Sequence, residues 1–252
     1  MAKRSENSID GQVALVTGAA RRIGAAIAAS MHAAGARVAI HYRASKEDAD
    51  TLCSRLNSLR KDSAITFQAD LISEDGPDRL IESVIDWSGR LDILVNNASS
   101  FYPTPLGKID NAQWTDLVGS NMRAPLFLAQ AAAPHLRAAG GNIVNIVDIH
   151  ARRPLRDYHV YGAAKAGLAM LTRSLAKDLA PEVRVNGIAP GAIAWPEDGM
   201  TESVKMNIIE QIPLGRTGEP ADVANAVLFL VRDATYVTGQ VIPIDGGRSI
   251  GW

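Results

Sequence analysis

The chain has 252 residues, a formal net charge of −1 and 47% hydrophobic residues, which suits a single α/β domain over residues 1–252. A charge this close to zero gives no reason to expect nucleic acid or a membrane surface as a partner. The first eleven residues are polar, and no apolar run approaches the roughly 18 residues of a membrane span. We therefore expect a cytoplasmic protein. Cys53 is the only cysteine, which excludes an intrachain disulfide. The five histidines are scattered along the chain, so a zinc site is not expected.

Short apolar runs alternate with longer amphipathic stretches along the whole chain. In chain order the pattern predicts strand 13–16, helix 23–34, strand 38–40, helix 46–61, strand 64–68, helix 77–87, strand 93–95, helix 111–136, strand 143–147, helix 160–179, strand 183–188, helix 221–231 and strand 240–244. The strands are apolar throughout, as in a parallel sheet covered on both faces. We therefore expect a single-domain, doubly wound, Rossmann-like α/β fold with helices on both faces. The segment 194–211 interrupts the alternation after a strand end, and we expect it to be a substrate loop.

The first strand leads into a candidate phosphate-binding loop. Gly18 permits a sharp turn, and Gly24 permits close packing of the following helix. The free N–H groups and the positive dipole end of that helix can receive a phosphate. The loop departs from the G-x-G-x-x-G fingerprint, because Arg22 stands inside it, where its guanidinium can reach a pyrophosphate or an anionic substrate edge. An ordinary turn with two glycines remains the alternative.

The end of the second predicted strand indicates which nicotinamide cofactor is used. An NAD-selective site would carry an acid there, for the ribose 2′-OH. Here no acid occurs before Glu47, whereas Arg43 and Ser45 suit a 2′-phosphate. The sequence therefore favours NADPH, with a solvated basic turn as the alternative.

Tyr161 and Lys165 lie four residues apart, on one face of a predicted helix. An ammonium group beside a phenol favours the phenolate and lowers the phenol pKa, which suits proton transfer during hydride chemistry. Asn121 falls within the long predicted helix 111–136. It is either a structural residue or part of a water-bridged proton path.

Several motifs, in order and spacing, resemble those of the short-chain dehydrogenase/reductase family. They are Thr17-Gly18, Asn96-Asn97-Ala98, Asn121, Tyr161 with Lys165, the segment from Arg184 through Pro190 to Gly191, and Asp245-Gly246-Gly247. Three segments further resemble pteridine reductases: Thr17 to Gly24 with His41-Tyr42, Asn96 to Leu106, and Asn145 to Asp148, where an aspartate replaces the family's usual serine thirteen residues before Tyr161.

The resemblance implies NADPH as cofactor, a pterin or folate as the small-molecule substrate, and a homotetramer without a nucleic-acid or membrane partner. It implies catalytic roles for Asp148, Tyr161, Lys165 and Asn121, and substrate contacts from Arg22, Ser99, Phe101, Asp148 and Tyr161. Phe101 would sandwich the pterin against the nicotinamide, and Asp70 would accept the adenine amino group. The implied cofactor-binding residues are Gly18, Arg22, Ile23, Gly24, His41, Tyr42, Arg43, Ser45, Asp70, Leu71, Asn97, Ala98, Ser99, Lys165, Pro190, Gly191 and Ile193.

The resemblance implies a homotetramer of D₂ symmetry, built on the long helices after the fourth and fifth strands and on a C-terminal strand region. The small residues of 129–133, with Ala163 and Ala164, permit close helix approach, and the tail ending at Trp252 could reach a neighbouring active site. Alternatives stay open for individual residues, since Phe101 could only pack a loop and Asp148 could belong to a buried ion pair. Two other functions compete with pterin reduction: reduction of an unrelated carbonyl such as a 3-oxoacyl thioester, and nucleotide sensing without catalysis. Asp148 in place of the family's usual serine argues against reduction of a 3-oxoacyl thioester. The presence of Asn121, Tyr161 and Lys165 argues against nucleotide sensing without catalysis.

Overall fold

The computed structural model describes residues 8–195 and 201–250. Its strands are β1 (Val13–Val16), β2 (Arg37–Tyr42), β3 (Ala64–Gln68), β4 (Ile93–Asn96), β5 (Asn142–Ile146), β6 (Arg184–Pro190) and β7 (Val241–Ile244). Within the described residues they form one parallel sheet in the order β3-β2-β1-β4-β5-β6-β7. The expected doubly wound sheet is confirmed.

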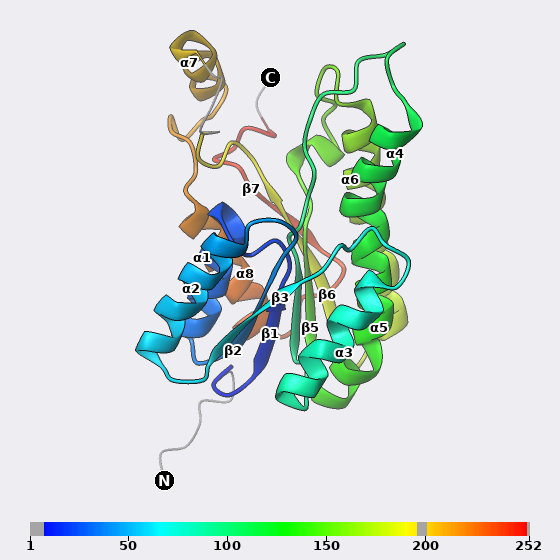
Figure 1. Ribbon diagram of the computed structural model, residues 1–252. Helices are drawn as coiled ribbons and strands as arrows, with labels where there is room; N and C mark the ends of the chain where they lie inside the picture. The colour runs from blue at the N-terminus through cyan, green and yellow to red at the C-terminus, as the bar shows by residue number, and fades with distance from the viewer. Residues whose placement is uncertain (1–7, 196–200, 251–252) are drawn as a thin grey trace.

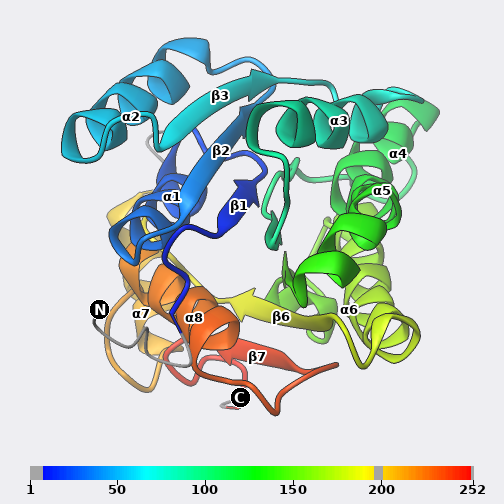
Figure 2. The ribbon, with the colours of Figure 1, turned by 90° about the horizontal axis from the view of Figure 1, so that it is seen from below.

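Helices cover both faces of this sheet (Figures 1 and 2). The helical segments are α1 (Arg22–Ala33), α2 (Lys46–Leu59), α3 (Gly76–Ser88), α4 (Asn111–Val118), η1 (Gly119–Arg123), α5 (Ala124–Ala139), η2 (Ile149–Ala151), α6 (His159–Leu179), α7 (Glu202–Glu210) and α8 (Pro220–Arg232). Helices α1, α2 and α8 lie on one face, and α3, α5 and α6 on the other. Among the described residues, no helix combines the length and hydropathy of a bilayer span.

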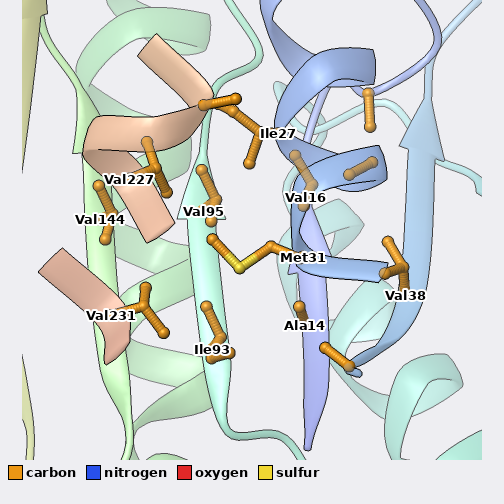
Figure 3. Close-up of a cluster of buried hydrophobic side chains, with 14 of the residues drawn as sticks. Ala14, Val16, Ile27, Met31, Val38, Ile93, Val95, Val144, Val227 and Val231 are labelled. Atoms are coloured by element: carbon orange, nitrogen blue, oxygen red, sulfur yellow. The ribbon is translucent and has the colours of Figure 1, made fainter. Parts of the chain in front are cut away.

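The core between α1, α8 and the sheet follows from the apolar stripes of these helices (Figure 3). Ile27 and Met31 of α1 and Val227 of α8 pack against Val16 and Val95 of the central strands, and all five are fully buried. Burial of each such side chain contributes about 1.5–3 kcal/mol. This packing fixes α1 on the sheet, and with it the loop from which α1 starts.

The chain order of the strands places the site. After β3 the chain returns to the other side of β1, so that β2 and β4 flank β1. At such a reversal the loops leaving neighbouring strands diverge at the carboxyl edge of the sheet and leave a crevice for a ligand. The loops after β1 and β4 therefore form the expected ligand site, and α7 lies beyond this edge of the sheet (Figure 1).

The helix predicted over 111–136 is not one uninterrupted α-helix. Its middle turn, η1, is a π-helical turn in which the N–H of Ala124 donates to the carbonyl of Gly119, five residues back. Pro125 follows directly and has no N–H for the carbonyl of Asn121, so an α-helical ladder cannot continue here. The expected substrate loop 194–211 contains helix α7, while residues 196–200 lie outside the described residues.

The small residues expected in a tetramer interface are only partly available for it. Ala129 and Ala164 are buried within the chain, in the packing of α5 and α6. Ala163 is exposed, and so are the larger Trp114 of α4 and Met170 of α6. An interface on these helices would therefore use Trp114 and Met170 rather than Ala129 and Ala164. Trp252, expected to reach a neighbour, lies outside the described residues.

Candidate active site

The phosphate loop between β1 and α1 needs its glycines. Gly18 has φ +60°, and a Cβ there would lie 2.9 Å from the Cα of Ala98. A Cβ on Gly24 would lie 2.3 Å from the carbonyl oxygen of Gly18. Asn97 fixes the turn, because its Nδ2 donates to the carbonyls of Thr17 at 2.8 Å and Gly18 at 3.0 Å. The predicted sharp turn and close packing are both present.

The first turn of α1 leaves room for an anion. No side chain caps the N-terminus of this helix, and its first turn contains no acidic residue. Free N–H groups and the positive dipole end therefore face the carboxyl edge of the sheet, where a pyrophosphate can be bound. Together with the glycine cradle, this helix start fits a dinucleotide cofactor.

Arg22 opens α1 in a left-handed conformation, with φ +51°, which a non-glycine residue rarely adopts. Its Nη2 donates to the carbonyls of Ile193 and Ala194, each at 3.3 Å. Ala194 is itself left-handed, with φ +47°. Arg22 thus ties the phosphate loop to the segment after β6, a contact that the sequence did not predict.

His41, near the end of β2, joins the phosphate loop to the segment that follows β3. Its Nδ1 accepts from the N–H of Gly18 at 3.1 Å, and its Nε2 donates to the carbonyl of Ala69 at 3.1 Å. Burial lowers its pKa to about 4, against a smaller opposing effect of the Ala69 bond and of Asp70. The imidazole is therefore neutral at pH 7 and positions the loop from below.

A cavity of about 140 Å³ lies at this edge, lined by residues that include Gly18, His41, Arg43, Asp70 and Ser99. Arg43 is 58% exposed at its side chain, and its Nη1 lies 3.5 Å from Oδ1 of Asp116 on α4. The Oδ1 of Asp70 accepts from the N–H of Ile72 at 3.0 Å. The lining of the cavity therefore includes an exposed cation, Arg43, and an oriented carboxylate, Asp70.

The other expected cofactor residues occupy several positions. Leu71 and Ala98 line the same cavity, Ser45 precedes α2, Ile23 follows Arg22 in α1, and Pro190 and Gly191 mark the end of β6. Tyr42 instead packs in the hydrophobic core, with 6% of its surface exposed. Its side chain therefore supports β2 rather than lining the cavity.

Tyr161 and Asp148 form the polar centre of the site. The Tyr161 hydroxyl donates to Oδ2 of Asp148 at 2.7 Å, and Oδ1 of Asp148 accepts from the N–H of His150 at 2.8 Å. Lys165 is buried, its Nζ donates to the carbonyl of Ile146 at 2.8 Å, and it lies 5.7 Å from the centre of the Tyr161 ring. Asp148 is therefore bonded to the phenol rather than held in an ion pair.

The expected lowering of the Tyr161 pKa is not found. Burial and the neighbouring Asp148 charge raise the pKa of this phenol well above its usual value. Burial also lowers the pKa of Lys165 to about 8, opposed by Asp148. The Tyr161 hydroxyl thus keeps its proton at neutral pH and can give it to a substrate.

Asn121 connects the π turn to the loop after β4. It is fully buried; its Oδ1 accepts from Oγ of Ser99 at 2.7 Å, and its Nδ2 donates to the carbonyls of Ser100 at 2.9 Å and Leu117 at 3.0 Å. These bonds fix the loop that carries Ser99 and Phe101.

An exposed aromatic face lies beside the polar centre. The Phe101 ring is 54% exposed, stacks on Tyr158 with centroids 4.6 Å apart, and meets the edge of Tyr161 at 4.8 Å. Tyr158 was not predicted, although its place three residues before Tyr161, at the start of α6, is a signal for it. A flat ring laid on this face would lie within reach of Tyr161.

The fold and this constellation define a class of protein. The family model described as enoyl-(acyl carrier protein) reductase matches residues 18–249, and the chain belongs to the short-chain dehydrogenase/reductase family of oxidoreductases. Members of this family use a nicotinamide cofactor. The match covers nearly the whole chain.

Three relatives show how wide the family likeness is. The chain is 41% identical to pteridine reductase 1 of Leishmania tarentolae, over 94% of this chain and 96% of that one. It is 36% identical to a 3-oxoacyl-acyl-carrier-protein reductase of Staphylococcus aureus, over 93% and 96%. A solved structure described as a short-chain alcohol dehydrogenase of Sinorhizobium meliloti superposes with a TM-score of 0.93 at 33% identity, covering 98% of this chain and 100% of that one.

Proposed function

We propose that this oxidoreductase is an NADPH-dependent pteridine reductase, which transfers hydride to a C=N bond of a dihydropterin or dihydrofolate. The observation that carries the proposal is the hydrogen bond from Tyr161 to Asp148 beside the exposed face of Phe101. A carboxyl bonded to a phenol suits an imine, because the nitrogen next to the reduced carbon must receive a proton. The similarity to pteridine reductase 1 supports the same substrate class.

A bound nicotinamide cofactor would supply the hydride. Phe101 holds the flat substrate ring by stacking, and positioning of this kind lowers the barrier by several kcal/mol. Tyr161 gives its proton to the substrate nitrogen, since its pKa is raised and it remains protonated. Asp148 orients the phenol, and a proton taken up from solvent by Asp148 and passed to the Tyr161 phenolate restores the hydroxyl. Buried Lys165 supplies positive charge beside the Tyr161 ring.

NADPH is favoured over NADH by the end of β2. The described residues there place Arg43 at the cavity mouth, and the sequence contains no acid at this strand end. A guanidinium binds a 2′-phosphate through charge-assisted hydrogen bonds. We also propose a homotetramer in which α4, α5 and α6 meet a second copy, because Trp114 and Met170 expose apolar surface there.

The alternative substrate is a 3-oxoacyl thioester, which the similarity to 3-oxoacyl-acyl-carrier-protein reductases favours. The position thirteen residues before Tyr161 argues against it, because Asp148 stands where ketone-reducing relatives of this family carry serine. NADPH oxidation measured with dihydrobiopterin, dihydromonapterin, dihydrofolate and an acetoacetyl thioester separates the two. A kcat/KM highest for the thioester would overturn pterin reduction.

A further inference from the structure

The turn after β7 fixes the position of Arg248. Asp245 accepts two backbone bonds with its carboxylate, from the N–H of Gly247 at 3.0 Å and from the N–H of Ser249 at 2.7 Å. Gly246 and Gly247 both have positive φ, at +63° and +88°, which glycine adopts without strain. The Asp245 oxygens are thus occupied by backbone donors, and the turn presents the Arg248 side chain in a defined direction.

Arg248 lies against the loop that carries Asp148. Nη1 of Arg153, in the same loop, donates to the carbonyl of Arg248 at 3.3 Å. The Arg248 side chain is partly buried, and this burial lowers its pKa, while the charges of Asp148 and Asp245 oppose the lowering. Arg248 therefore lies between the loop that follows Asp148 and the end of α7, where its guanidinium contacts Gln211.

Within the described residues the Arg248 guanidinium binds a neutral partner. Its Nη2 donates to Oε1 of Gln211, after α7, at 3.3 Å. A guanidinium carries five N–H donors, and a partly desolvated one gains most from an anionic acceptor. The adjoining loop adds the cations of Arg152, Arg153 and Arg156, in a chain whose net charge is only −1. Arg156 lies 3.9 Å from Asp157, so the acids of this region balance part of that positive charge.

We propose that Arg248 binds an anionic group on the side chain of the substrate, a carboxylate or a phosphate ester, so that this site prefers anionic pterins over neutral ones. The inference rests on the proposed pterin reduction and adds a recognition point that the Tyr161–Asp148 pair does not provide. Pteroylglutamates, which carry two carboxylates, and phosphorylated pterins both meet this description. The C-terminal turn thus selects the tail of the substrate, while Phe101 receives its ring.

The test compares Arg248→Gln with wild type in steady-state kinetics of the full chain with NADPH. The substrates are dihydrofolate, dihydroneopterin monophosphate and the neutral dihydrobiopterin. We expect KM for the two anionic substrates to rise about 10- to 100-fold more than KM for dihydrobiopterin, the effect of one charge-assisted hydrogen bond. A rise with only one of them identifies the anion as carboxylate or phosphate. Arg55→Gln, at an exposed position of α2, makes the same change in net charge and is the matched control.

Other outcomes overturn the inference. If Arg248→Gln changes KM equally for neutral and anionic substrates, or lowers kcat for both at constant KM, the residue acts on Asp148 or on the fold instead. Arg248→Lys guards against loss of folding, since it keeps the charge, and it should recover part of the preference. If wild type turns over dihydrobiopterin with no preference for anionic substrates, this inference alone fails. If wild type reduces no pterin, the proposed function fails, and this inference with it.

Discussion

The hydroxyl of Tyr161 and Oδ2 of Asp148 are 2.7 Å apart, and the other oxygen of this carboxylate is held by the N–H of His150. The two bonds fix the carboxylate from both sides. Because Asp148 accepts a hydrogen bond from the phenol, and burial and the Asp148 charge raise the pKa of Tyr161, the pair keeps Tyr161 protonated until a substrate nitrogen arrives.

Asp148→Asn should reduce turnover of a dihydropterin by about 10²–10⁴, the usual effect of removing a proton-handling group. NADPH affinity, measured by fluorescence titration, should stay within about twofold, since the substitution removes no residue of the cofactor cavity. Asp148→Ser provides the comparison, assayed on a dihydropterin and on a reactive ketone. Equal loss on both substrates, or no loss on either, would contradict a special role of this carboxyl in reducing an imine.

Arg43→Gln should weaken NADPH binding by roughly 10- to 100-fold, because it removes a charge-assisted bond to the 2′-phosphate. NADH has no such phosphate, so its dissociation constant serves as the control and should change little. Calorimetric titration measures both. Wild-type protein should also show a higher kcat/KM with NADPH; equal values for the two cofactors would refute the preference.

Gly18→Ala should destabilise the protein more than Gly89→Ala does, in urea unfolding. Both residues have positive φ, at +60° and +73°, so both substitutions carry the conformational cost of about 1 kcal/mol. A Cβ on Gly18 also meets Ala98, whereas on Gly89 it meets nothing within 4 Å. The difference between the two variants measures the close approach alone, and Gly18→Ala should also weaken cofactor binding. Equal free energies of unfolding would show that the loop relaxes around the added methyl group.

His41 should make the protein less stable as the pH falls from 6.5 to 4. Its folded pKa of about 4 lies below the ordinary 6.5, so over this range the unfolded chain binds more protons than the folded one. The contribution of neutral His41 to the free energy of unfolding is fully present above pH 6.5 and disappears as the pH falls to 4. It amounts to roughly 3 kcal/mol. His41→Gln cannot titrate here and removes this part of the slope. Identical pH dependence of the unfolding free energy in both proteins would mean that folding does not lower the pKa of His41.

Wild-type protein should sediment at micromolar concentration as a particle of four 26.8 kDa chains. Met170→Glu, on the exposed face of α6, should shift it toward smaller species, because it puts a charge into the proposed apolar contact. Ser54→Glu, at an exposed position of α2 on the other face of the sheet, makes the same change in net charge and is the control. A wild-type monomer would rule out the assembly.

The regular elements could be predicted from the sequence because periodicity reports burial directly. The run at 13–16 is apolar at every position, and the strand it predicts, β1, is buried at every position. Local features also predict part of the site. A tight turn requires Gly18 and Gly24, and helical spacing places Tyr161 and Lys165 on one face of α6.

Other contacts depend on tertiary packing and left no local signal. The bond from Arg22 to Ile193 joins segments 171 residues apart, and the pKa of Tyr161 follows from a burial that spacing does not report. The contact between Arg43 and Asp116 also joins segments that lie far apart in the sequence. By contrast, Pro125 was a readable sign that the long helix changes its hydrogen bonding, since proline cannot donate.

The π turn at η1 carries one residue more than an α-helical turn needs, and that residue sets the rotation between α4 and α5. Deleting one residue from 119–123 would rotate the helix beyond it by about 100° relative to α4, while Pro125 would still lack a backbone donor. Asn121 would then leave Ser99 and the loop that presents Phe101. The extra residue of this turn thus gives up helical hydrogen bonding for a side chain that holds the loop of the site.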